Sequence, residues 1–593
     1  MRSRPEPASD HRRIAQPWRS RIAACAAAGV LVLSGCSDSG SGEGGDADGD
    51  QSNGSAGEQE PTAEEAAAEE AAARDAALAG PAEEHRQQAA ELVEEMSLEE
   101  QAGQVLIGEY QGTDTAEMAQ RIEDLHLGGA IVMGENVPEG EDGVDTSALE
   151  SSLQALADAD PDRSVAPLIG VDQEGGLVTR VGEPLIEWPA PMAYGAAADA
   201  DLARQGHAAM GQQLADLGFT AAFAPNGDVT VGAEDPTIGS RSFGSDADAV
   251  ADLSLAGIRG LADSGVTGSI KHFPGHGSVT EDSHETLPVQ DSSIEELTAN
   301  DWVPFSEAID AGAPMMMMGH IEVPALEEGV PSSLSSEAYQ QLRDMGHDGV
   351  VVTDAMNMGA LAQSYGPEDA VVRALSAGAD LLLMPADVTA AHAAIVEAVE
   401  SDELSADRLS EAAERVAALM LWQQELASGD LEALQGEAPD TGDVEAADLP
   451  AAGTSEVLDP DPDAVAEDIA AESVTLVSGT CQADLASTGI QIQGGDETDR
   501  ARLSAAAEAA GIPVGQGLDV VLLGSAQGTA GGDVAVALDN PGALDDATAE
   551  TQIALYGRSA ESFEALVEVL DGGEAPGALP VAVGEAERGE SGC

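Results

Sequence analysis

The sequence predicts an α/β protein with a TIM-like (β/α)8 barrel, followed by a smaller C-terminal α/β sandwich domain. Short apolar runs alternate with amphipathic segments over residues 104–424, as in buried parallel strands covered by helices. About eight repeats occur, which is the number that closes a barrel. Polar residues stand at the C-terminal ends of several runs, where barrel enzymes carry their chemistry. A doubly wound sheet is the alternative that this pattern leaves open.

The expected strands are short and continuously apolar, and the expected helices between them show apolar residues at helical spacing. The strand runs are 104–107, 129–133, 166–171, 220–224, 268–272, 315–320, 350–354 and 380–384. The main helical runs are 201–217, 247–264, 294–311, 335–345, 367–377 and 406–424. Ser97 and Glu100 have the spacing of a capping box, which predicts a helix that begins just after Ser97. Four consecutive methionines in the run 315–320 are expected in the core.

The first 35 residues are interpreted as a signal peptide and excluded from the fold. An arginine-rich start is followed by the apolar run 22–33, which is well short of the ~20 residues of a membrane-spanning helix. The run ends in Leu33-Ser34-Gly35-Cys36, which resembles the lipobox of bacterial lipoproteins. That resemblance implies cleavage before Cys36, lipidation of its thiol, and a location at the cell surface with membrane contact only through the lipid. A plain secretory signal is the alternative.

Composition marks the remaining boundaries. Residues 36–85 are rich in Gly, Ser, Glu and Ala and predict an acidic, disordered tether, and residues 86–427 hold the barrel. Residues 428–464 predict a linker, and residues 465–593 predict a second α/β domain, with strands near 474–477, 519–523 and 534–538 and helices near 497–510 and 561–570. This last domain contains no His and no Lys, so we do not expect it to supply a proton-transfer group.

The formal net charge of −87 excludes some partners and suggests a habitat. A surface this acidic disfavours nucleic acid, whose phosphates need clustered Lys and Arg, and it opposes adsorption to anionic lipid. We interpret the charge as a device for solubility and hydration in saline surroundings, with a surface that binds cationic ligands as the alternative. We expect a monomer.

Four cysteines occur along the chain. If Cys25 leaves with the signal and Cys36 is lipidated, only Cys481 and Cys593 remain, and whether they pair is left open. Neither has His or Cys neighbours at zinc-ligand spacing, so we predict no metal site, and no cofactor is expected.

The stretch richest in chemical groups follows the fifth expected strand. It reads Lys271-His272-Phe273-Pro274-Gly275-His276-Gly277 and is followed four residues later by Asp282-Ser283-His284. It holds the only lysine of the chain and three of the ten histidines. Other ionisable residues end the neighbouring strands: Asp172, Asp228, His320 and Asp354.

The order and spacing of five such pieces resemble glycoside hydrolase family 3, specifically its β-N-acetylhexosaminidase branch. The pieces are Lys271–Gly277 with Asp282-Ser283-His284, then 170–176 with Arg180, 223–225 with Asp228, 241–244, and 352–356. The resemblance covers residues ~90 to ~425 well and 465–593 loosely. It implies a carbohydrate substrate and an exo-acting, retaining β-N-acetylglucosaminidase that removes terminal GlcNAc from peptidoglycan fragments or chitooligosaccharides through a covalent glycosyl-Asp intermediate.

By the same resemblance, Asp354 is the catalytic nucleophile, and its place at the end of an apolar strand would fix its rotamer. His284 is the acid/base, oriented by Asp282, because a carboxylate can fix an imidazole ring and support its charged form. We expected Gly275 and Gly277 to give the loop the freedom to move His284 over the sugar. His276 is interpreted as structural support of the loop, and His320 is left undecided.

The family's sugar-binding positions match six residues, whose carboxylates and cations can exchange hydrogen bonds with sugar hydroxyls. They are Asp172, Arg180, Asp228, Arg241, Lys271 and His272. An ion pair between Arg180 and Glu174 is an alternative role for Arg180. Other functions left open are a GlcNAc phosphorylase using the same residues, a β-glucosidase, and a lipid-anchored sugar-binding protein without catalysis.

Overall fold

The computed structural model describes residues 77–593, except for residue 142, residue 430 and the segments 432–459 and 525–530. The expected signal peptide with Cys36, most of the expected tether 36–85 and most of the expected linker 428–464 therefore lie outside the described residues. Among the helices of the described part, none has both the length and the apolar character needed to cross a bilayer.

The N-terminal domain is built on a closed ring of parallel strands, so the predicted TIM-like barrel is confirmed. Two sheets, of order β11-β1-β2-β5-β6-β7 and β10-β9-β8, form the ring. Bridges between Asn226 and Lys271 and between Val352 and Leu381 join them, and only Ser269 separates β7 from β8. The strand ranges are β1 Leu106–Gly108, β2 Gly129–Val132, β5 Leu168–Val171, β6 Ala221–Ala222, β7 Thr267–Gly268, β8 Ile270–Phe273, β9 Met315–Met318, β10 Val350–Thr353 and β11 Leu382–Leu383.

Each of the eight predicted runs overlaps a strand of the ring, and the run 268–272 overlaps both β7 and β8. All four methionines of β9 are buried, as expected for core residues. Outside the ring, β3 (Glu139–Gly140) and β4 (Gly143–Val144) form a small antiparallel hairpin. The parallel register carries the C-terminal ends of the strands to one rim, where the candidate site lies.

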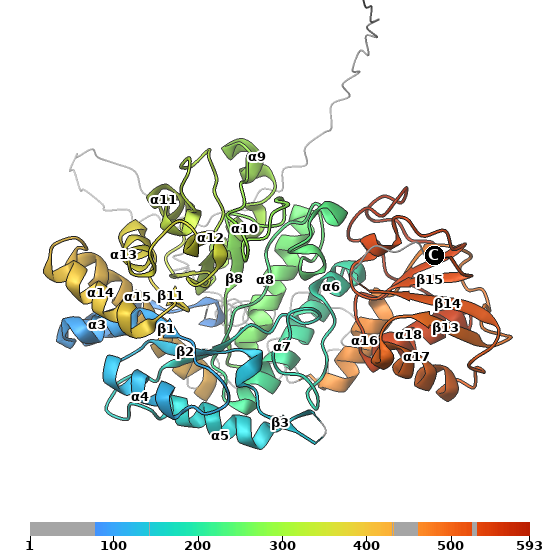
Figure 1. Cartoon of the computed structure of the whole chain (residues 1–593), viewed down its shortest axis with the longest axis horizontal. Helices are drawn as coiled ribbons and strands as arrows, with labels where there is room; N and C mark the ends of the chain where they lie inside the picture. The colour runs from blue at the N-terminus through green and yellow to red at the C-terminus, as the bar shows by residue number, and fades with distance from the viewer. Residues whose placement is uncertain (1–76, 142, 430, 432–459, 525–530) are drawn as a thin grey trace, which may run out of the picture. The chain divides into compact units, whose positions relative to one another are not determined.

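Helices surround the strands as an outer layer (Figure 1). They are α2 Glu83–Glu95, α3 Leu98–Gln104, α4 Ala116–Leu125, α5 Thr146–Ala157, α6 Pro191–Ala197, α7 Ala200–Leu217, α8 Ala247–Asp263, α9 Ile294–Ala299, α10 Val303–Asp310, α11 Ser336–Asp344, α12 Gly359–Ala362, α13 Pro367–Ala377, α14 Val388–Glu400 and α15 Ala406–Ser428. The predicted capping box is present at α3, where the Glu100 amide donates to Ser97 Oγ and the Ser97 amide donates to Glu100 Oε2.

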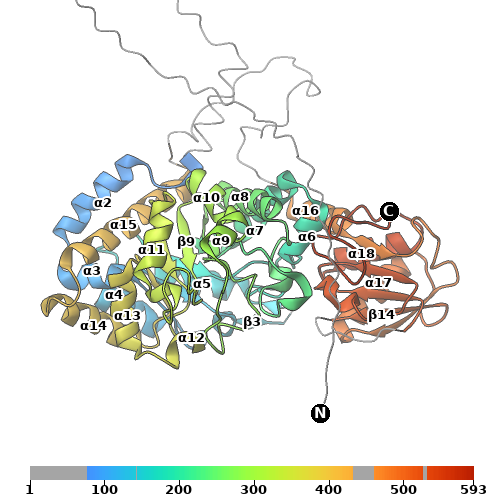
Figure 2. The same ribbon diagram turned by 90° about the horizontal axis from the view of Figure 1, so that it is seen from above.

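The folded chain begins earlier than the predicted start at residue 86. Helix α2 already begins at Glu83 and lies along α15, as Figure 2 shows. Leu78 is 2% exposed, and His85 is buried with its Nε2 3.1 Å from Glu425 Oε2. Residues 77–85 thus pack on the barrel, and the tether boundary was set too late because Ala- and Glu-rich sequence is compatible with both a tether and a helix.

The segment 294–311, predicted as one helix, is two. Helix α9 ends at Ala299, Asn300 leaves helical geometry with φ −137° and ψ −80°, and α10 begins at Val303. Pro304 fits the first turn of α10 because its missing N–H would have no partner there. The break turns Asp301 and Trp302 inward, and both are buried.

The C-terminal domain is a five-stranded sheet of order β12-β16-β15-β14-β13, with only β12 antiparallel to its neighbour. Its elements are α16 Pro462–Ser473, β12 Thr475–Ser478, β13 Ile490–Gly494, α17 Glu497–Ala509, β14 Leu518–Leu523, β15 Val534–Ala537, β16 Thr551–Ala554 and α18 Ala560–Leu570. Helices α17 and α18 pack side by side against the sheet (Figure 1). Strands β13 and β16 were not predicted, because polar residues interrupt their apolar pattern.

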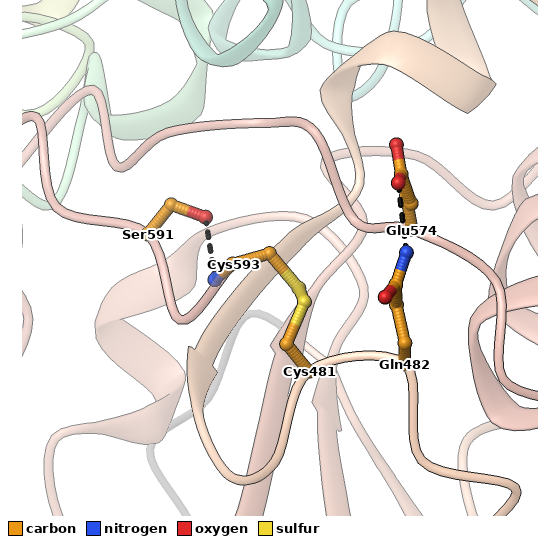
Figure 3. The surroundings of a disulfide bond; sticks show 5 residues. All are labelled: Cys481, Gln482, Glu574, Ser591 and Cys593. Carbon is orange, nitrogen blue, oxygen red and sulfur yellow. Dashed lines mark hydrogen bonds between the residues drawn. A yellow bond between two sulfur atoms is a disulfide. The ribbon is translucent and has the colours of Figure 1, made fainter.

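The last segment of the chain, residues 577–593, contacts both domains. The Ala578 amide donates to Ala196 of the barrel, and the Ser245 amide donates to the Pro580 carbonyl. At the other end, Cys593 forms a disulfide with Cys481, which closes the question left open by the sequence (Figure 3). The disulfide therefore holds a segment that also contacts Ser245, which lies four residues after Arg241.

Candidate active site

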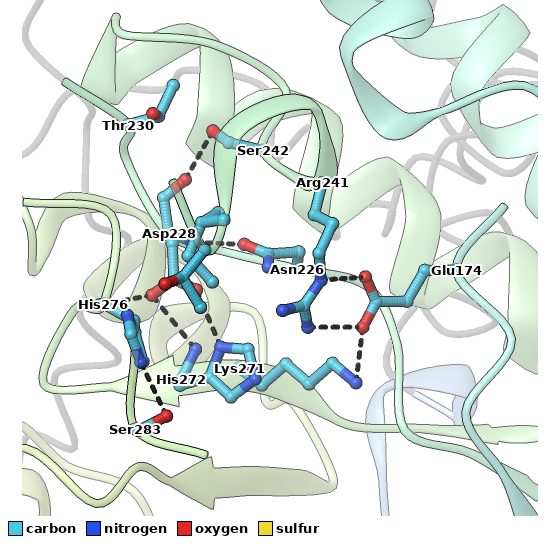
Figure 4. Close-up of polar contacts among 12 residues, drawn as sticks. Glu174, Asn226, Asp228, Thr230, Arg241, Ser242, Lys271, His272, His276 and Ser283 are labelled. Carbon is cyan, nitrogen blue, oxygen red and sulfur yellow. Dashed lines mark hydrogen bonds and ion pairs between the residues drawn. The ribbon is translucent and has the colours of Figure 1, made fainter. Parts of the chain in front are cut away.

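Seven of the predicted site residues come from the C-terminal ends of barrel strands or the loops that follow them. Asp172 follows β5 directly, Lys271 and His272 lie in β8, and Asp354 follows β10. Asp228 and Arg241 lie on the long segment between β6 and α8, and Arg180 on the segment between β5 and α6. The structure thus brings the β5, β6 and β8 groups into one cluster (Figure 4).

Asp228 is the hub of this cluster and is fully buried. Its Oδ2 lies 2.7 Å from His272 Nδ1, and its Oδ1 accepts the amide of His276 at 2.7 Å. Its own amide donates to Asn226 Oδ1 at 2.7 Å. Burial favours the neutral acid, but the His272 ring and the His276 amide outweigh it and keep the pKa of Asp228 below its ordinary value. The ionised carboxylate fixes the His272 ring, so that Nε2 is left for another partner.

Glu174 joins two cations of the cluster. Its carboxylate is 2.6 Å from the Lys271 ammonium and accepts two hydrogen bonds from Arg241, each at 2.9 Å. Burial opposes its charge, yet Arg241 and Lys271 hold the pKa of Glu174 well below its usual range. The predicted alternative of a Glu174–Arg180 pair is therefore wrong, because both oxygens of Glu174 already serve Arg241 and Lys271.

Asp172 and Arg180 are the more open members of the cluster. Asp172 Oδ1 accepts from Lys271 Nζ at 2.8 Å, and no group of the described chain contacts its Oδ2. Burial works against the Lys271 ammonium, but Asp172 and Glu174 raise its pKa above the ordinary value. Arg180 is half-buried, and its Nε is without a hydrogen-bond partner in the described structure. These two side chains can still accept from and donate to a ligand.

Asp354 is half-buried at the end of β10. Its amide donates to the Met318 carbonyl and its Oδ1 accepts from the Ala355 amide, which fixes the carboxylate at the rim. Burial would raise its pKa, but the rings of His272 and His320, the Ala355 amide and the Lys271 ammonium lower the pKa of Asp354 to about 2. The group is therefore an anion at neutral pH, as a nucleophile must be.

His320 is the residue whose role the sequence left undecided. It is fully buried, and its two ring nitrogens contact Ser333 Oγ at 2.7 Å and the Ala355 carbonyl at 2.9 Å. Burial lowers its pKa, so the ring is neutral at neutral pH. His320 therefore braces the backbone beside Asp354 and is in no position to exchange protons with solvent.

Asp282 and His284 form a separate pair on the loop after β8. The His284 Nδ1–H donates to Asp282 Oδ1 at 2.7 Å, and the His284 amide donates to the same oxygen at 2.9 Å. Burial raises and the His284 contacts lower the pKa of Asp282, with a net decrease. The side chains are 63% and 42% exposed for His284 and Asp282, so His284 Nε2 is free to meet a substrate.

The loop of this pair is docked on the segment that follows Asp354. The amide of Gly359 donates to the His284 carbonyl at 3.2 Å, and the amide of Ala360 donates to the Ser283 carbonyl at 3.2 Å. The segment after Asp354 and the loop that carries Asp282 and His284 are thus joined by hydrogen bonds.

Gly275 and Gly277 are closely packed, whereas the sequence suggests that they give the loop freedom to move. A Cβ on Gly275, at φ +112°, would lie 2.8 Å from Cβ of the buried Asp301, and one on Gly277 would lie 2.4 Å from the Val229 carbonyl oxygen. The glycines permit close packing. Ser278 Oγ donates to Asp301 and the Trp302 indole donates to the Pro274 carbonyl, so this part of the loop is clamped from both sides.

Comparison with known proteins names the family. The model of the glycosyl hydrolase family 3 N-terminal domain matches residues 97–419, which is more than half of the chain. The chain belongs to glycoside hydrolase family 3. The predicted family is therefore confirmed. The matched range spans the barrel and every predicted catalytic and sugar-binding residue.

Curated family 3 relatives carry hexosaminidase names. Beta-hexosaminidase A of Pseudoalteromonas piscicida is 33% identical over 332 residues, which cover 51% of this chain and 54% of the relative. The chain thus spans only about half the length of that relative. Beta-hexosaminidase LpqI of Mycobacterium tuberculosis is 33% identical over 52% of this chain and 79% of the relative.

A solved family 3 structure extends the likeness to both domains. The β-N-acetylglucosaminidase from Paenibacillus sp. str. FPU-7 superposes with a TM-score of 0.70 at 28% identity, and covers 82% of this chain and 99% of its own. The two-domain fold is therefore shared with that protein.

Three features of the site escaped prediction. The sequence suggests Arg180 as a partner of Glu174, and nothing in its context indicates that Glu174 binds both Lys271 and Arg241. Asn226, which caps Asp228, stands inside the 223–228 piece and could have been noticed there. The contact of Ser283 with His276 depends on how the loop folds back, which spacing alone does not reveal.

Proposed function

We propose that this protein is an exo-acting, retaining β-N-acetylglucosaminidase that releases terminal GlcNAc from peptidoglycan fragments or chitooligosaccharides. The observation that supports it most is the Asp282–His284 pair, held by hydrogen bonds to the segment that follows Asp354. A histidine acid/base oriented by a carboxylate is what the β-N-acetylhexosaminidase branch uses. The names of the family 3 relatives point the same way.

In the first step an Asp354 oxygen attacks the anomeric carbon of the bound sugar. The bond from that carbon to the leaving oxygen breaks, and protonated His284 Nε2 gives its proton to that oxygen. The positive charge that His284 carries before it gives up this proton is balanced by the ionised Asp282. The product is a glycosyl ester on Asp354 and the free leaving group.

In the second step neutral His284 takes a proton from water as the water oxygen attacks the anomeric carbon, and Asp354 leaves as carboxylate. Two displacements retain the anomeric configuration. The low pKa of Asp354 suits both the attack and the departure.

The sugar itself is bound by the cluster on the neighbouring strands. Asp172 Oδ2 and the Arg180 guanidinium have no protein partner in the described structure, and His272 Nε2 faces away from Asp228. These groups can accept from and donate to ring hydroxyls, while Lys271 and Arg241 complete the cradle.

The test is hydrolysis of an aryl β-N-acetylglucosaminide and an aryl β-glucoside by the full chain, each with and without phosphate. We expect GlcNAc to be released much faster than glucose, at a rate that does not depend on phosphate. Formation of GlcNAc-1-phosphate would replace the proposal with a phosphorylase, faster release of glucose would replace it with a β-glucosidase, and no release from either would favour a sugar-binding protein.

We also propose where the enzyme works. The Cys36 lipobox supports a lipid anchor at the cell surface, and the formal charge of −87 supports a saline habitat. Mass spectrometry of the mature N-terminus tests the anchor through a diacylglycerol-sized mass on Cys36. Activity and melting temperature measured from low to molar salt test the habitat, and both should rise with salt.

A further inference from the structure

Ser283 stands between the two members of the acid/base pair and differs from all its neighbours. The run 280–287 is exposed or half-exposed at every other position, but Ser283 is 2% exposed. A buried hydroxyl needs a partner, because an unpaired one costs free energy. Ser283 therefore has a specific contact beneath the loop.

That contact is His276, whose Nε2 lies 2.8 Å from Ser283 Oγ (Figure 4). Burial and the nearby His272 ring lower the pKa of His276, so the ring is neutral and carries one N–H. Its Nδ1 is buried and has no partner. Since an unpaired N–H is costlier than an unpaired lone pair, the hydrogen lies on Nε2, which donates to Ser283 Oγ.

His276 is in turn fixed by the sugar cluster. Its amide donates to Asp228 Oδ1, the same carboxylate that holds the His272 ring through Oδ2. On the other side, the Ser283 carbonyl accepts from the Ala360 amide on the Asp354 side of the rim. Ser283 is thus bonded to both halves of the site.

We infer that Ser283 is the positioning residue of the acid/base loop: its hydrogen bond with His276 latches the Asp282–His284 pair to the Asp228 cluster. The hydroxyl touches neither the sugar nor the reacting atoms. It acts through His284 by fixing the backbone between Asp282 and His284. The inference rests on the proposed function, since it assigns a role in proton transfer by His284.

The experiment compares wild type with Ser283→Ala on two β-GlcNAc substrates, one with a good aryl leaving group and one with a poor alkyl leaving group. A misplaced acid costs most where the leaving group needs its proton. We expect kcat/KM, which reports the first step, to fall about tenfold to hundredfold on the poor substrate and to change less than about threefold on the good one. Thr280→Ala, on the same loop with its hydroxyl bonded only to its neighbour Glu281, should behave as wild type.

Amide hydrogen exchange of residues 280–287 gives a readout that needs no catalysis. Ser283→Ala should exchange faster there, and only there, whereas Thr280→Ala should not. If Ser283→Ala keeps both its exchange protection and its rate on the poor substrate, or loses rate equally on both substrates, the latch is refuted. If the wild type cleaves no β-GlcNAc substrate, the proposed function fails, and unchanged exchange would refute the latch separately.

Discussion

The Lys271 ammonium lies 2.6 Å from the Glu174 carboxylate, and both groups are buried. The only lysine of the chain thus neutralises an internal acid at the same time as it faces the sugar cluster. Arg241 shares that acid, so one carboxylate positions two of the proposed sugar-binding cations. The cradle depends on Glu174 although Glu174 was not predicted to touch the sugar.

Replacing Glu174 with Gln should therefore cost both stability and binding. The variant leaves the buried Arg241 without its ion-pair partner and Lys271 with Asp172 alone, and breaking a buried pair costs about 3–5 kcal/mol. We expect chemical denaturation to show a loss of this size, together with a higher KM. Glu183→Gln is the control, because Glu183 is an exposed partner of Arg502 and should change stability by less than about 1 kcal/mol. Equal effects of the two variants would contradict the account.

The loss of activity caused by removing the His284 imidazole should depend on the leaving group of the substrate. His284→Ala cannot protonate the departing oxygen, so kcat/KM, which reports the first step, should fall by about 10²–10⁴-fold on a poor leaving group and far less on an activated aryl one. Steady-state kinetics on both substrates measure the difference. A similar loss on both would argue against acid catalysis by His284.

Stability should fall between pH 7 and pH 5, in part because of His207. Burial lowers the pKa of His207 to about 4, against 6.5 for the unfolded ring, although its contact with the Ala203 carbonyl opposes the shift. Between these values the unfolded chain binds the proton and the native protein does not, so the penalty begins as the pH falls through 6.5 and levels off near 4.

The contribution of His207 to the difference in unfolding free energy between pH 7 and pH 5 is about 2 kcal/mol. His207→Gln should reduce that difference by this amount, whatever it does to stability at pH 7. Denaturant titrations at the two pH values measure it. An unchanged difference in the variant would show that His207 titrates normally.

The disulfide should stabilise the enzyme and support its sugar site. Cys481 and Cys593 enclose a separation of 112 residues, for which loop entropy predicts a gain of about 4–5 kcal/mol at most. The double variant Cys481→Ser with Cys593→Ser should melt at a lower temperature, and reduction of the wild type should give the same shift. A thiol titration that finds two free cysteines in the untreated protein would remove the basis of this prediction.

Much of the fold could be predicted because its strands are wholly buried. The run 350–354 is continuously apolar up to Thr353, which is typical of a strand buried on both faces, and Asp354 marks the end of the strand at the rim of the barrel. The break in the helix at 300–302 could not be predicted, because it depends on hydrogen bonds that Trp302 and Asp301 form with the 274–278 loop, which is distant in the sequence. Strand β13 escaped because its exposed residues are polar.

The site was predictable in its residue types and not in its contacts. The resemblance of the 271–284 piece to glycoside hydrolase family 3 led to the pair Asp282–His284, whose side chains the structure holds at 2.7 Å. The same letters suggested mobile glycines, yet Gly275 and Gly277 are packed against Asp301 and Val229 from distant parts of the chain. These packing partners are distant in the sequence, so the residues around the two glycines could not predict them.

Asp354 carries the central claim, and one measurement tests it most directly. The account predicts that Asp354→Ala, with a melting temperature near that of the wild type, releases no detectable aglycone from an aryl β-N-acetylglucosaminide that the wild type cleaves. The carboxylate is the only group proposed to attack the anomeric carbon, so nothing remains to form the glycosyl ester. Turnover by Asp354→Ala at a substantial fraction of the wild-type rate would contradict the nucleophile assignment and the mechanism built on it.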